Sequence, residues 1–187
     1  MKDSDAMNRL EEIFKSPMLQ INLLAAVTGA CAALMTWVFI SMSQGIQSIF
    51  YGDSFIENSL KGTEREWLII FIPALGGLIA GLIIDYWSKE AKGAGVPIVM
   101  EAVAVKEARL SAKKAIAKCF ASATCIGTGM SLGRVGPMVV ISSTIGSEIG
   151  QRTGKTVEDT RTMVGCGAAS AITAAFNAPL GGVLFAI

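Results

Sequence analysis

Three long stretches of this chain carry no charged residue. None occurs between Lys15 and Asp53, between Glu66 and Asp85, or after Arg161. Crossing the hydrocarbon core of a bilayer takes about 20 apolar residues, so the first stretch can cross with tilt and the second is just long enough. Hydrophobic residues make up 52% of the chain and charged residues 17%, which is more apolar than an ordinary soluble domain. We therefore predict an integral membrane protein with at least two full crossings.

The distribution of basic residues predicts how the chain is oriented. Residues 88–118 contain seven lysines and arginines, whereas residues 51–66 contain two. By the positive-inside rule, the amino terminus and the 88–118 segment face the cytoplasm, with the protein in a plasma or inner membrane. Residues 1–16 mix three basic with four acidic side chains and are predicted to be a cytoplasmic amphipathic lead-in to a transmembrane domain at 17–187.

Several functional classes have no support in the sequence. The chain has no histidine, and its four cysteines form no CxxC pair, so we predict neither a metal site nor a Ser-His-Asp triad. No nucleophile and base can be paired, so the chain is not expected to be an enzyme. The Gly165-Cys166-Gly167 run lacks the rest of a dinucleotide fingerprint and is expected to pack helices. No basic stripe with aromatic residues suggests nucleic acid, and no cofactor is expected.

The apolar pattern predicts an all-α fold that becomes broken after the second crossing. The expected helices cover residues 18–50, 67–87, 97–106, 111–127, 137–150 and 159–176, with one more starting at Pro179. Several of these are too short to cross alone. Backbone breaks at membrane depth are tolerated only where protein buries them or where they line a cavity, so a series of short helices indicates a transport pathway.

Two of the breaks share a Gly-rich design that ends in proline. They are Gly93-Ala94-Gly95-Val96-Pro97 and Gly133-Arg134-Val135-Gly136-Pro137. A proline in the first helical turn gives up an N–H that would be unpaired anyway, and the neighbouring amides stay open to an anion. Arg134 lies between two apolar runs, which favours a functional charge, the alternative being an arginine that snorkels to the interface.

These two motifs, followed by the segment from Ala175 to Phe185 (AFNAPLGGVLF), resemble the CLC family of chloride channels and chloride/proton antiporters, in the family's order. The resemblance implies a homodimer in the lipid bilayer with one anion pore per subunit. Each subunit is then a bundle of tilted and broken helices in two inverted repeats, of which this chain supplies the first. The transmembrane anion-channel domain at 17–187 is accordingly expected to be incomplete at its carboxyl end, as a fragment of a longer polypeptide or as a natural half. The second repeat would be its partner.

The resemblance also assigns roles to residues of the two motifs, with chloride or another small anion as the permeant ligand. The expected anion-binding positions are Ala94, Gly95, Val96, Arg134, Val135, Gly136 and Met138. The expected helix-start scaffold is Gly93, Pro97, Gly133 and Pro137.

Two positions depart from the family pattern. Val135 stands where the family has a glutamate that competes with chloride and carries protons, and Ala94 stands where a serine hydroxyl donates to the central anion. Valine cannot change charge, so the resemblance implies an uncoupled, passive anion channel without that gate. Ala94 implies weaker central anion binding or altered selectivity. An ion-coupled antiporter, using another acid such as Glu101 or Glu148, and a non-conducting anion sensor are the alternatives.

Overall fold

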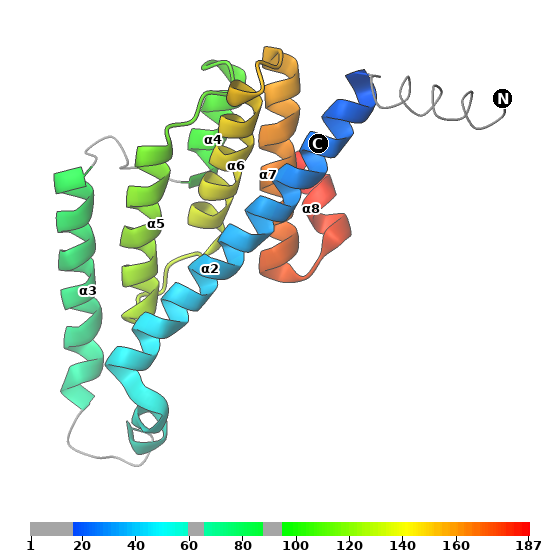
Figure 1. Ribbon diagram of the computed structural model, residues 1–187. Helices are drawn as coiled ribbons and strands as arrows, with labels where there is room; N and C mark the ends of the chain where they lie inside the picture. The colour runs from blue at the N-terminus through cyan, green and yellow to red at the C-terminus, as the bar shows by residue number, and fades with distance from the viewer. Residues whose placement is uncertain (1–16, 60–65, 88–94) are drawn as a thin grey trace, which may run out of the picture.

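The computed structural model describes residues 17–59, 66–87 and 95–187, and these residues form helices and no strand. The all-α prediction is therefore confirmed for the described residues. Figure 1 shows the helices as a bundle, crossed by one long diagonal helix. In chain order they are α2 (Pro17–Ser59), α3 (Glu66–Trp87), α4 (Gly95–Ala104), α5 (Ala112–Gly127), α6 (Val135–Arg152), α7 (Val157–Phe176) and α8 (Pro179–Ala186). The predicted lead-in at 1–16 lies outside the described residues.

The long diagonal helix α2 extends beyond its predicted end. The sequence predicted an end at Phe50, but helix continues to Ser59 across a kink at Gly52, whose φ is 54° and ψ is 164°. Only glycine adopts such a backbone without strain, so the chain bends there instead of stopping. Just before the kink, the Tyr51 hydroxyl donates a hydrogen bond to the Thr128 carbonyl at 2.9 Å. The kink therefore lies beside the turn that leads from α5 toward α6.

Membrane-spanning capacity is clearest for α2. Among the described residues, Met18–Gly52 is long and apolar enough to cross a bilayer by itself, while Phe71–Trp87 and Gly95–Ala104 are shorter apolar helices. We expected at least two full crossings. Among the described residues, α2 alone has the length and composition for one. Of the other helices, α4 with ten residues and α8 with eight are short, as the breaks in the sequence predicted.

Helix α6 lies at the centre of the bundle. It contacts α2, α4, α5 and α7, and Figure 1 shows it between α5 and α7. Its buried hydroxyls bond to neighbouring helices: Ser142 donates to the Ala32 carbonyl of α2 at 3.3 Å and Ser143 donates to the Val164 carbonyl of α7 at 3.3 Å. The hydrophobic effect does not favour association of helices in lipid. Interhelical hydrogen bonds and close packing therefore stabilise the bundle.

Close packing between α6 and α7 depends on small residues. A Cβ on Gly146 would overlap the Met163 backbone, and one on Gly167 would overlap the Ser142 backbone. Gly167 therefore packs helix against helix, as predicted for the Gly165-Cys166-Gly167 run. The start of α7 is stabilised by a capping box, in which Thr156 and Asp159 bond to each other's backbone amides.

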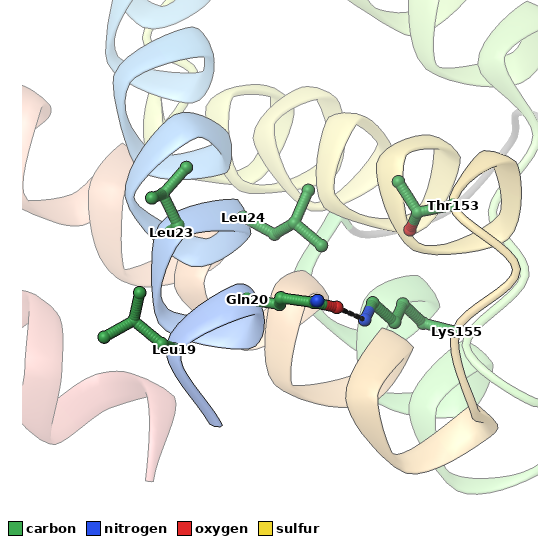
Figure 2. A pocket seen from close by; sticks show the side chains of 6 residues that line it. All are labelled: Leu19, Gln20, Leu23, Leu24, Thr153 and Lys155. Carbon is green, nitrogen blue, oxygen red and sulfur yellow. Dashed lines mark hydrogen bonds between the residues drawn. The ribbon is translucent and has the colours of Figure 1, made fainter. Parts of the chain in front are cut away.

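The start of α2, the α4–α5 turn and the α6–α7 turn lie at the same end of the bundle (Figure 1). Figure 2 shows the Lys155 ammonium beside the side-chain amide oxygen of Gln20. The ammonium donates a hydrogen bond to this oxygen at 3.2 Å. These two residues lie in a pocket of about 420 Å³, which is lined by Leu19, Gln20, Leu23, Leu24, Thr153 and Lys155. The α4–α5 turn, which holds Lys106 and Arg109, thus lies at the same end of the bundle as the α6–α7 turn, which holds Lys155.

Candidate anion-binding site

The two Gly-rich motifs both form helix starts, two residues earlier than predicted. Helix α4 begins at Gly95 and α6 begins at Val135, so Pro97 and Pro137 each occupy the third helical position. The first residues of a helix have no carbonyl four positions earlier to bond, which makes proline tolerable there. The amides of Gly95 and Val96, and those of Val135 and Gly136, are therefore the donors that each helix start leaves open.

The two helix starts meet through their backbones. A Cβ on Gly95 would overlap the carbonyl oxygen of Gly136, while the amide nitrogen of Gly95 lies 3.6 Å from the corresponding Cβ position on Gly136. Figure 1 shows α4 beside α6. Each helix start carries roughly half a positive charge from its aligned peptide dipoles, so the contact brings two positive ends together. Such an arrangement can bind an anion without a cationic side chain.

The residues around the α6 start divide into an exposed and a buried group. Gly133 and Arg134 are exposed, Val135 and Gly136 are half-buried, and Met138 is buried. The Met138 amide donates to the Arg134 carbonyl at 3.5 Å, which is the first hydrogen bond of the helix. Met138, Val135 and Gly136 remain the predicted donors at this helix start, and of the three the Met138 amide has this long backbone contact.

Three residues of the first Gly-rich motif are described at the start of α4. Gly95 is buried, Val96 is half-buried against the apolar core, and Pro97 is exposed. Gly93 and Ala94 lie outside the described residues. The serine-to-alanine departure at Ala94 therefore stays a prediction from sequence.

The two acids considered for a proton route are both paired with nearby basic side chains. Glu101 lies 2.8 Å from the Lys106 ammonium, and both side chains are more than half exposed. Glu148 lies 3.3 Å from Arg152, one helical turn away on α6. Glu101 is thus an exposed charge, and Glu148 is a partly buried one beside Arg152.

The described part of the chain contains no cluster of metal-ligating side chains and no paired cysteines. No group of three or more His, Cys, Asp or Glu residues there could hold a metal ion. The four cysteines are free, and Cys31 on α2 is exposed.

Three features of this region were not predicted from sequence. The Gly95–Gly136 contact joins residues that are far apart in the chain. Lys118, counted among the basic residues of the 88–118 segment expected to face the cytoplasm, is buried on α5. Ser147, one of several small hydroxyl residues on α6, forms three hydrogen bonds at the far end of the helix. Only its position three residues beyond Thr144 in a Ser/Thr-rich apolar helix could have suggested a buried polar role.

Residues 76–187 match the family model described as voltage gated chloride channel. The chain belongs to this family. The matched region contains both helix starts and their contact. Three curated relatives show the range of names within the family. The chain is 34% identical over 169 residues to a ClcB-like protein of Ralstonia nicotianae, covering 87% of this chain and 39% of that protein.

The other two relatives are named for different activities at nearly equal sequence identity. The chain is 31% identical over 173 residues to the voltage-gated ClC-type chloride channel ClcB of Yersinia pseudotuberculosis, covering 90% of this chain and 41% of that protein. It is 30% identical over 195 residues to the H(+)/Cl(-) exchange transporter ClcA of Klebsiella pneumoniae, covering 100% of this chain and 39% of that protein. The chain thus spans about two-fifths of the length of the voltage-gated chloride channel relatives that it matches.

Proposed function

We propose that this chain contributes the first half of the anion pathway of a membrane protein that conducts chloride passively. The observation that carries the proposal is the contact between the starts of α4 and α6, which brings the positive ends of two helices together. The relatives named as chloride channel and as chloride exchanger agree with this ligand. The other half of the site would come from the second repeat, in a homodimer with its amino terminus in the cytoplasm.

The choice of channel over exchanger depends on Val135. Sequence identity does not decide, because channel and exchanger relatives are 31% and 30% identical to the chain. Val135 is the first residue of α6 and packs partly against the apolar core. Its side chain neither ionises nor accepts a hydrogen bond, so it cannot exchange a proton for chloride at this position. Proton-coupled exchange is the second candidate, since a relative named as an H(+)/Cl(-) exchange transporter matches the chain over its whole length.

The test uses the complete polypeptide in chloride-loaded liposomes. Chloride efflux is recorded after addition of a potassium ionophore, while a pH electrode follows proton movement. Efflux without proton uptake is the expected result. Stoichiometric proton movement would instead support the exchanger, and no efflux would support an anion sensor.

Neutralising Arg134 should lower anion flux at low ionic strength. The side chain is exposed at the α6 start, where its charge adds to the positive potential of the two helix ends. We expect Arg134→Gln to reduce chloride flux roughly tenfold at low salt, and less at high salt, because a screened charge concentrates anions less. Arg161→Gln is the control, since Arg161 is an exposed arginine near the start of α7. Equal effects of the two substitutions would contradict a local role for Arg134.

A further inference from the structure

The turn after α4 has an unfavourable backbone. Glu107 and Ala108 both adopt left-handed conformations, with φ of 52° and 58°. Non-glycine residues rarely adopt this region, and two in succession persist only where surrounding contacts hold them. Ala108 is fully buried, and its amide donates to the Ala102 carbonyl at 2.8 Å. The turn therefore needs external support.

Ser147 of α6 supplies that support. Its hydroxyl donates to the Ala108 carbonyl at 2.6 Å and accepts from the Leu110 amide at 3.0 Å. It also accepts from the Gln151 side-chain amide at 2.8 Å. A serine hydroxyl has one donor and two acceptor positions, so this fully buried side chain uses all of them.

Helix α4 is consequently held to α6 at both ends. At its start, the backbone of Gly95 contacts that of Gly136. Just beyond its end, the carbonyl of Ala108 bonds to Ser147. Helix α4 has ten residues, and isolated helices shorter than about 12 residues are marginal in water. Between these two attachments, Val99 and Ala102 of α4 are buried in the apolar core that α6 also lines, so the attachments fix the two ends of a helix that packs along its length.

We propose that Ser147 is a positioning residue for the anion site, although it lies eleven residues beyond Gly136. By holding the α4–α5 turn, it sets where the start of α4 lies relative to the start of α6. The open amides of Gly95 and Val96 then keep their place beside those of Val135 and Gly136. This inference rests on the proposed function for its effect on chloride, whereas its effect on α4 does not depend on that function.

Ser143 is the matched control on the same helix. It is also fully buried, and its hydroxyl donates to the Val164 carbonyl of α7 at 3.3 Å. Replacing either serine by alanine removes one buried hydroxyl from α6. Only Ser147→Ala removes an attachment of α4.

The experiment uses the complete polypeptide in detergent and measures three quantities. These are the chloride Kd by titration calorimetry, the Tm, and amide hydrogen exchange across residues 96–104. We expect Ser147→Ala to raise the Kd about tenfold, the order that the loss of a buried hydrogen bond produces, and to speed exchange in α4. Ser143→Ala should lower the Tm while leaving both the Kd and α4 exchange near wild type. Gln151→Ala, which leaves the serine in place, should shift Kd and exchange in the same direction by less.

The outcomes separate the two proposals. A wild-type protein that binds no chloride contradicts the proposed function. Unchanged α4 exchange in both Ser147→Ala and Gln151→Ala overturns the role of Ser147, whether or not chloride binds. Equal Kd values for wild type and Ser147→Ala, in a wild type that binds chloride, overturn its role in positioning the site. If Ser147→Ala does not fold, the Gln151→Ala values decide in the same way.

Discussion

Gly95→Ala is expected to abolish most anion transport through a single added methyl group. That methyl would overlap the carbonyl oxygen, carbonyl carbon and Cα of Gly136, and backbone atoms in a packed helix cannot turn aside as a side chain can. The start of α4 must then move away from that of α6. Overpacking costs about 1–3 kcal/mol of stability, and a shift of about 1 Å at a binding site can cost roughly 100-fold in rate. Chloride efflux from liposomes and Tm in detergent measure the two effects.

Gly81→Ala is the control for adding a methyl group to a glycine in an apolar helix. A Cβ on Gly81 of α3 meets nothing within 4 Å, so the substitution should leave flux unchanged and gain about 0.5–1 kcal/mol from helix propensity. If Gly95→Ala transports chloride as well as Gly81→Ala does, the close contact of the helix starts is not required for transport.

Val135→Glu is expected to make chloride flux strongly dependent on pH. A carboxylate on the first residue of α6 would lie where the open amides and the helix dipole favour negative charge, and would compete with chloride there. A tethered group acts at an effective concentration of about millimolar or more, so we expect flux at neutral pH to fall about tenfold. The competing form is the ionised one. Flux should therefore recover as the pH is lowered and the carboxyl takes up a proton.

Val135→Gln separates charge from size in this experiment. Glutamine has nearly the same shape as glutamate but does not ionise, so its flux should be independent of pH. Liposome efflux measured between neutral and acidic pH, with proton movement followed in parallel, tests both variants. Identical pH profiles for Val135→Glu and Val135→Gln would show that position 135 does not face the anion, and the assignment of the gate position would be wrong.

Local chemistry explains which parts of the fold could be predicted from the sequence. Charge-free stretches and prolines in first helical turns mark helices wherever they occur, because a missing N–H and a membrane-length apolar run act within a few residues. The predicted helices match the observed ones in number and order over the described residues. The end of α2 was misplaced because Gly52 bends the chain and does not stop the helix.

The features of the candidate site also divide into those that local sequence determines and those that tertiary packing determines. The sequence by itself determined that a helix begins within two residues of Pro97 and of Pro137, because proline and glycine act locally. Only the tertiary structure decided that Gly95 meets Gly136 and that Ser147 holds the α4–α5 turn. These contacts join residues 37 or more positions apart in the chain. Packing of helix on helix settles such choices, and no local pattern encodes it.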